Sequence, residues 1–183
     1  MNEVQPIRNK RHINAIKKAL SGRDLLLFII GINSGLRISD ILKLRVGDVR
    51  DRDYIVVKEQ KTGKTKRFAI NKAIKDAVKE IVPADAPDDE YLFKSRKGGN
   101  KPITRVQAYR ILNDAAERAG VKDKIGEIGC HTLRKTVGYW AYKNGADLTT
   151  IMRMFNHSSQ AVTLRYIGVT AEEVDEVYHT LNL

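Results

Sequence analysis

The chain has 183 residues, 42% of them hydrophobic, which is enough for one domain with a packed core. Its 33 basic and 22 acidic side chains give a formal net charge of +11, and the basic residues occur in every segment, which favours a polyanionic partner such as nucleic acid. The single cysteine, Cys130, excludes an internal disulfide and a cysteine-based metal cluster, and the longest apolar run, residues 25–32, is too short to cross a membrane.

Three helical segments are predicted before residue 45. Residues 12–20 carry apolar side chains three and four positions apart, and residues 24–33 contain the longest apolar run. Ser34 and Gly35 interrupt this pattern, and helical spacing resumes over residues 38–44. Arg37 is therefore expected at the start of a helix, directly after a glycine turn.

One β-hairpin is predicted in the middle of the chain. Residues 54–58 and 66–70 are rich in branched and aromatic side chains and are joined across Thr62-Gly63. This turn offers two lysines, Lys61 and Lys64. A helix over residues 73–81 follows, and a proline-bearing surface loop comes after it.

The remaining chain is predicted to be mainly helical. Residues 91–93 are expected to form a brief strand and residues 95–102 a basic loop. A long helix follows, with Thr104 as its cap and Gly120 as its stop. Further helices are predicted over residues 132–144, 147–155, 159–166 and 171–180. We therefore expect a mainly α fold with a small antiparallel β-sheet, an α+β domain.

The segments 129–136 and 155–166 carry the side chains with the most distinctive chemistry. They contain two imidazoles, His131 and His157, a guanidinium, Arg134, and a phenol, Tyr166. A phenol with a pKa near 10 is protonated at neutral pH, so it needs a proton acceptor and nearby cations before it can act as a nucleophile. Each of these residues alone more often has a structural role, and Cys130 is expected to be a small buried side chain.

Taken together, these residues, their order and their spacing resemble the tyrosine recombinases, the class that includes phage integrases and chromosome-dimer resolvases. The similarity covers residues 10–170. The family usually has Leu-Gly-His at its second histidine, whereas this chain has Phe155-Asn156-His157, a departure that removes no catalytic group. The resemblance assigns six catalytic residues, namely Arg37 in Gly-Leu-Arg-Ile-Ser, Lys61 at the hairpin turn, His131 and Arg134 in His-Thr-Leu-Arg, His157 in Asn-His-Ser-Ser and Tyr166 in Thr-Leu-Arg-Tyr.

The resemblance implies site-specific DNA recombination or integration. Tyr166 would attack a DNA phosphodiester as the nucleophile, with His131 as the general base, and form a 3′-phosphotyrosyl bond. The 5′-hydroxyl released in this step would later attack another strand. Bond energy is conserved, so no nucleotide cofactor is expected. No pair of carboxylates stands beside these groups, and two arginines would neutralise the phosphate, so no metal is expected either.

The other catalytic residues implied by the resemblance act on the phosphate. Arg37 and Arg134 would hold its non-bridging oxygens, and His157 would hydrogen-bond it. Lys61 would protonate the departing 5′-oxygen as the general acid, with Lys64 as the alternative.

The implied partner is double-stranded DNA, on which the protein would assemble as a dimer or tetramer, with DNA-bending accessory proteins as further candidate partners. We expect a cytoplasmic, nucleoid-associated protein without membrane contact. Basic side chains outside the catalytic set are candidates for binding the DNA backbone, with affinity that falls as salt rises. They are Lys43, Arg45, Lys64, Arg96, Lys97, Lys101 and Arg105.

Residues 1–183 are expected to form a single catalytic domain, without the N-terminal DNA-clamping domain that the family usually carries. Residues 171–183 would add a C-terminal helix that docks either on a neighbouring protomer or on its own domain. Two other activities remain open from the residues alone. One is relaxation of supercoiled DNA by a type IB topoisomerase, and the other is gene regulation by a DNA-binding protein that lost the reaction.

Overall fold

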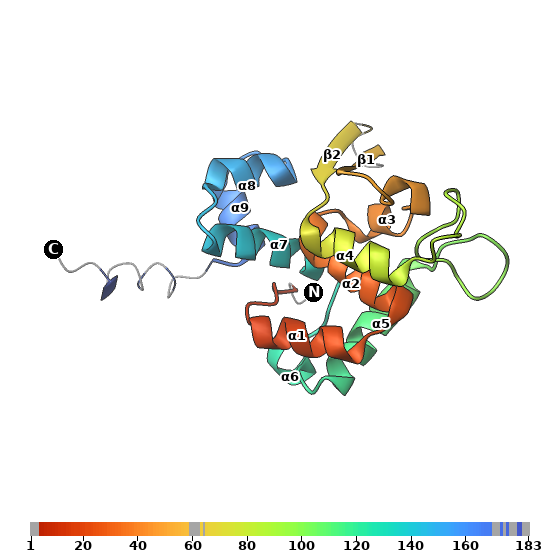
Figure 1. Cartoon of the computed structure of the whole chain (residues 1–183). Coiled ribbons are helices and arrows are strands. Elements are labelled where there is room, and N and C mark those ends of the chain that lie inside the picture. The colour runs from red at the N-terminus through yellow and green to blue at the C-terminus, as the bar shows by residue number, and fades with distance from the viewer. Residues whose placement is uncertain are drawn as a thin grey trace.

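The computed structural model describes residues 4–58, 63, 65–169, 173, 175 and 179–180, and Figure 1 shows how their elements are arranged. The strands are β1 (Tyr54–Lys58) and β2 (Thr65–Ala69), and a 3₁₀ turn spans Val46–Asp48. This part of the chain is mainly α with a small antiparallel sheet, as the sequence predicts. Its α-helices are α1 (Lys10–Ala19), α2 (Gly22–Ser34), α3 (Ile38–Ile41), α4 (Lys72–Ile81), α5 (Arg105–Arg118), α6 (Lys122–Ile125), α7 (Thr132–Lys143), α8 (Leu148–Phe155) and α9 (Gln160–Ile167).

Helix α2 forms the centre of the fold because apolar side chains surround it. Leu27, Phe28 and Ile30 have no exposed surface, and the helix contacts α1, α4, α5 and α7. A helix that is apolar on all sides is stable only when other elements cover it. A side chain at Gly31 would overlap Leu133, so this glycine lets α7 approach α2 closely. The contact sets the position of α7, which carries part of the candidate site.

The β-hairpin packs one face on the protein core. Ile55 of β1 lies opposite Phe68 of β2 in an antiparallel register, and both side chains are buried. Tyr54 and Val56 point to the other face and are exposed. This alternation follows the period of two in a strand. The strand β2 begins one residue earlier than the sequence predicts.

Several local features differ from the sequence analysis. The helix expected over residues 38–44 is shorter, because α3 ends at Ile41. The strand expected over residues 91–93 is reduced to an isolated bridge between Tyr91 and Arg45. Helix α6 and the 3₁₀ turn were not predicted, because elements of three or four residues are too short to display a period. The prediction that Cys130 is buried was wrong, because this residue lies in the turn before α7 and is exposed.

Helices α7, α8 and α9 pack together at one side of the molecule (Figure 1). Their shared core consists of Ile151, Phe155 and Ile167, all at most 2% exposed. A Cβ atom at Gly138 would lie 2.5 Å from a ring carbon of Phe155 and 2.6 Å from a methyl of Ile167. Only glycine fits at this contact, which brings α9 and its Tyr166 against α7.

The predicted C-terminal helix lies mostly outside the described residues. This applies to the apolar face that the sequence analysis assigned to it, formed by Val174, Val177, Tyr178 and Leu181. Within the described part, Glu173 forms an ion pair with Lys143, with 2.9 Å between Oε1 and Nζ. Docking of this segment on a neighbouring protomer stays a prediction.

Candidate active site

Arg134 lies inside the protein, on the first turn of α7. It is 4% exposed, and its Nη1 and Nη2 donate to the carbonyls of Gly35 at 2.6 Å and Phe155 at 3.1 Å. Its guanidinium carbon lies 4.7 Å from the centroid of the Phe155 ring. A buried charge is tolerated only where hydrogen bonds compensate for the lost water. Arg134 therefore ties α7 to the turn after α2 and to the end of α8.

The phenol of Tyr166 on α9 meets the imidazole of His131 at the start of α7. The distance between Oη and Nδ1 is 3.3 Å, and the rings meet edge to face. Lys135 is 4% exposed, and its Nζ lies 5.3 Å from the centroid of the Tyr166 ring. The phenol thus has a candidate proton acceptor within reach and a cation over its ring.

His157 also lies beside Tyr166, with ring centroids 4.8 Å apart and an interplanar angle of 73°. It follows Asn156, which ends α8 in the left-handed conformation, with φ 57° and ψ 45°. Asparagine adopts this conformation more readily than most residues. Asn156 therefore forms the turn that the family's usual glycine would form, and the departure in sequence leaves the position of His157 intact.

Nδ1 of His157 belongs to a local chain of hydrogen bonds. Nδ1 lies 3.1 Å from Oγ1 of Thr163, a residue with no exposed surface. The threonine hydroxyl has one proton, and it donates this proton to the carbonyl of Ser159 at 3.1 Å. With the hydroxyl proton on this carbonyl, the hydroxyl oxygen accepts from Nδ1–H, and Nε2 of the neutral imidazole carries a lone pair. In the opposite tautomer the hydroxyl donates to Nδ1 and Nε2 carries the proton.

Burial favours the uncharged forms of the His157 imidazole and the Tyr166 phenol in the free protein. It lowers the pKa of the His157 imidazole below its usual value, and the positive charges of Arg134, Lys66 and Arg37 lower this pKa further. Burial also raises the pKa of the Tyr166 phenol, while hydrogen bonding and charge from Arg134 and charge from Arg37 act in the opposite direction. The phenol therefore stays protonated at neutral pH and needs a neighbouring base to ionise.

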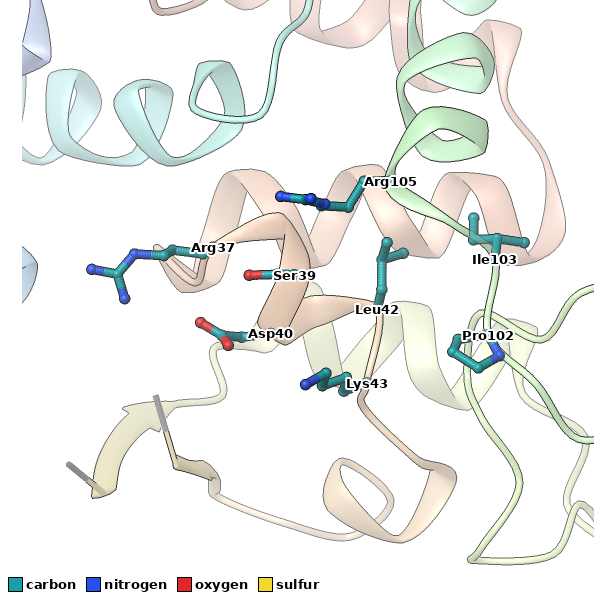
Figure 2. A pocket seen from close by; sticks show the side chains of 8 residues that line it. All are labelled: Arg37, Ser39, Asp40, Leu42, Lys43, Pro102, Ile103 and Arg105. Carbon is teal, nitrogen blue, oxygen red and sulfur yellow. The ribbon is translucent and has the colours of Figure 1, made fainter. Parts of the chain in front are cut away.

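Arg37 lies at the start of α3, two residues after Gly35, whose φ of 69° makes the turn from α2. It lines an open groove of about 520 Å³ together with Lys43 and Arg105, and Figure 2 shows these three side chains pointing towards the same side. The carboxylate of Asp40 is the one acidic group among the residues that line it. The groove is therefore positively charged overall and begins at a predicted catalytic residue.

The predicted catalytic lysine, Lys61, and its alternative, Lys64, lie outside the described residues. Lys66, which the sequence analysis did not select, is described. It lies on the same inward face of β2 as Phe68, and its Nζ is buried. Since its charge lowers the pKa of a site histidine, it adds to the positive potential of the site. Strand alternation was the signal that could have identified it, because a residue two positions before a core side chain faces the same way.

The other predicted backbone-binding residues divide into two groups. Arg96, Lys97 and Lys101 are exposed in a loop that extends beyond α3 and α5, away from α7, α8 and α9 (Figure 1). Arg45 is instead held by the protein, since its guanidinium carbon lies 4.3 Å from the centroid of the Tyr91 ring and Nη2 donates to the hydroxyl of Tyr91 at 3.2 Å. Its side chain fixes the base of this loop.

The site thus consists of imidazoles, a phenol and cations, not of paired carboxylates. Among the described residues, no group of three or more His, Cys, Asp or Glu side chains could hold a metal ion. The helices of the same residues are all too short or too polar to span a membrane.

Sequence comparison relates most of the chain to one family. Residues 6–173 match the phage integrase family. The probable integrase/recombinase YoeC of Bacillus subtilis is 45% identical, over 97% of this chain and 97% of its own length. The tyrosine recombinase XerA of Pyrococcus furiosus is 26% identical, over 88% of this chain and 55% of its own length. The chain therefore has the length of one relative and about half the length of the other.

Solved structures share the fold. The crystal structure of XerA recombinase has a TM-score of 0.79 with 19% identity and covers 100% of this chain and 66% of its own. The XerH site-specific recombinase bound to palindromic difH substrate, in a post-cleavage complex, has a TM-score of 0.72 with 20% identity, covering 93% and 50% of the respective chains. At this level of identity, the similarity establishes the fold alone.

Replacing His157 with glutamine should make stability less sensitive to acid. Because the folded-state pKa of His157 is lowered, the unfolded chain takes up its proton below a pH of about 6.5 while the folded chain does not. The histidine therefore contributes stability at neutral pH that is lost as the pH falls through its lowered pKa. Urea titrations on either side of this window would measure the change. His12→Gln on α1 is the matched control, and equal acid sensitivity of both variants would contradict the assignment.

Proposed function

This chain belongs to the phage integrase family, and we propose that it is a site-specific tyrosine recombinase that cuts and rejoins double-stranded DNA through a 3′-phosphotyrosyl intermediate. The observation that carries the proposal is the pairing of Tyr166 Oη with His131 Nδ1 at 3.3 Å, beside the buried Arg134. A tyrosine nucleophile requires a base within reach and a cationic setting. Both are present around this phenol.

In the proposed reaction, Tyr166 Oη attacks the scissile phosphorus in line while its proton passes to His131. The bond from phosphorus to the 5′-oxygen breaks, and a protonated 5′-hydroxyl leaves. In the second step, a 5′-hydroxyl of another strand attacks the phosphotyrosine and returns the phenol. Each step exchanges one phosphate ester for another, so no external energy source is required.

Arg134 and Arg37 would stabilise the charge of the five-coordinate transition state. The guanidinium of Arg134 is planar and has five N–H donors, a geometry that suits the non-bridging oxygens of a phosphate, and it donates to two carbonyls. These contacts also fix its orientation before substrate arrives. A preorganised donor of this kind is worth about 3–4 kcal/mol in the transition state.

His157 would bind the phosphate through Nε2, because Nδ1 lies against the hydroxyl of Thr163, and the proposed tautomer is the one in which Nδ1–H donates to this hydroxyl. A neutral imidazole in this tautomer cannot donate from Nε2, so this contact requires a proton on that nitrogen. The phosphate anion would favour the protonated form and oppose the effect of burial. DNA binding would therefore be coupled to proton uptake at His157.

Lys61 would act as the general acid for the 5′-oxygen, with Lys64 as the alternative. In the sequence both lie between β1 and β2, where a hairpin turn is expected, and an ammonium with three rotatable donors at such a turn suits proton donation to a leaving group. The buried charge of Lys66 on the adjoining strand would strengthen the potential that attracts the phosphate.

The groove in Figure 2 supports a path for the DNA backbone away from the scissile phosphate, along Lys43 and Arg105. Arg96, Lys97 and Lys101 would extend this path. XerH is bound to a palindromic substrate and lambda integrase was solved as a dimer on a core site, which supports assembly as a dimer or tetramer on DNA. We further propose that DNA-bending accessory proteins take part in the reaction and that the protein acts on nucleoid DNA in the cytoplasm.

Nicked suicide substrates carrying candidate sites should yield a covalent protein–DNA band, because the short fragment beyond the nick diffuses away and traps the intermediate. Tyr166→Phe removes the nucleophilic oxygen and should abolish the band. Tyr142→Phe on α7 is the matched control and should retain it. Denaturing electrophoresis measures both.

Two other results would replace the proposal, the first from a plasmid relaxation assay compared with a two-site recombination assay. Relaxation of supercoiled plasmid without exchange between two sites would indicate topoisomerase activity. If Tyr166→Phe changed neither cleavage nor phosphotyrosyl product while DNA binding and regulation persisted, the protein would be a regulator that lost the reaction.

A 5′-bridging phosphorothiolate substrate should identify the general acid, because a thiol with a pKa near 8.5 can leave without being protonated. Lys61→Ala should slow cleavage of ordinary DNA by about 10²–10⁴-fold and leave cleavage of the sulfur-substituted DNA nearly unchanged. Lys64→Ala should affect neither substrate strongly. The reverse pattern would assign the role to Lys64. If the sulfur-substituted DNA restored cleavage by neither variant, both lysines would be excluded as the general acid.

Replacing Lys43 or Arg105 with alanine should weaken DNA binding for all sequences alike. Each lost phosphate contact should also reduce the slope of log affinity against log salt by about 1. Lys18→Ala, an exposed change on α1, is the control and should leave the slope unchanged. Anisotropy titrations at several salt concentrations measure the slopes. Equal slopes for all three variants would mean that the backbone does not follow this groove.

A further inference from the structure

The segment before α1 forms a strap across α7. Its Pro6 and Ile7 are buried, and in Figure 1 the start of the chain lies next to α7. The amide of Ile7 donates to Oγ1 of Thr136 at 2.9 Å, and Nε1 of Trp140 donates to the carbonyl of Ile7 at 3.0 Å. These long-range contacts hold residues 4–9, which we call the strap, on the helix that carries Arg134.

The strap also reaches the end of the helix that carries Tyr166. Nη2 of Arg8 donates to the carbonyl of Gly168 at 2.5 Å. Gly168 is the C-cap of α9, two residues after Tyr166, and its φ of 75° is left-handed. A Cβ atom at this glycine would lie 3.0 Å from Nη2 of Arg8, so the close approach suits a residue without a side chain.

Helix α9 needs such an anchor. It has eight residues, and isolated helices of this length are unstable in water. The last carbonyls of a helix lack partners within the helix, and its C-terminus carries a partial negative charge that favours a cation. Arg8 supplies both a donor and a positive charge, from a segment already fixed to α7 at Ile7.

We propose that Arg8 is a positioning residue that holds the C-terminal end of α9 and thereby keeps Tyr166 Oη in line with His131. The inference rests on the proposed function for the role of Tyr166 as nucleophile. Small displacements matter at such a site, because a reacting atom misplaced by about 1 Å can cost on the order of 10²-fold in rate. Arg8 contacts none of the reacting side chains, so it would act through α9. Its guanidinium carbon also lies 5.6 Å from the centroid of the Tyr139 ring on α7, and the test therefore follows α7 as well.

The test compares Arg8→Ala, Arg8→Lys and Trp140→Phe in the full chain. Trp140→Phe removes the hydrogen bond from Trp140 to Ile7 but leaves those at Thr136 and Gly168, so it reports general loosening of the strap. Amide hydrogen exchange is measured over residues 160–168 and over α7. Arg8→Ala should raise exchange in residues 160–168 several-fold with little change in α7. Arg8→Lys, which retains a cationic donor, should recover part of the protection.

Single-turnover cleavage at saturating DNA supplies the second readout. Arg8→Ala should slow it about 10–100-fold with DNA affinity within about twofold of the unaltered protein, and Trp140→Phe should slow it far less. Unchanged exchange in residues 160–168 would overturn the proposal. So would equal loss of rate in Arg8→Ala and Trp140→Phe, or increased exchange without loss of rate.

Failure of the proposed function gives a different result. In that case the unaltered protein forms no covalent complex on any site, and the exchange measurement still decides whether Arg8 anchors α9.

Discussion

The buried guanidinium of Arg134 is the interaction on which the site depends. A cation with so little exposed surface would be strongly destabilising without acceptors, and its acceptors are the carbonyls of Gly35 and Phe155. These carbonyls belong to the turn before Arg37 and to the helix end before His157. The need to satisfy one charge thus brings three distant segments to one place.

Two left-handed residues make this convergence possible. Gly35 turns the chain from α2 towards α3, and Asn156 turns it out of α8. Each sharp turn points a main-chain carbonyl inwards to Arg134. Each also leads to a side chain of the site, Arg37 after Gly35 and His157 after Asn156. The asparagine carries out this task without glycine because its short polar side chain tolerates the conformation.

Burial and charge oppose each other around Tyr166. Burial favours the protonated phenol and the neutral His157, whereas the arginines favour the phenolate. A phosphate anion entering the site would offset part of the positive charge. In the free protein, Tyr166 and His157 are therefore uncharged and lie in the same site as Arg37, which lines a basic groove. As a member of the phage integrase family, the protein combines these residues with a fold in which the helix that carries Tyr166 is short and held by a few contacts.

The sequence by itself determined the longer helices and the hairpin of the described residues and the choice of candidate site residues, because apolar periodicity and the types of residues at Arg37, His131, Arg134 and Tyr166 are local properties. Only the tertiary structure decided which side chains meet. It buries Lys66, commits Arg45 to Tyr91, exposes Cys130 and joins Arg8 to a carbonyl 160 residues away. A periodic pattern shows which face of an element is apolar, but it does not show which distant segment covers that face. Such contacts arise only when separate elements pack, so they leave no local pattern in the chain.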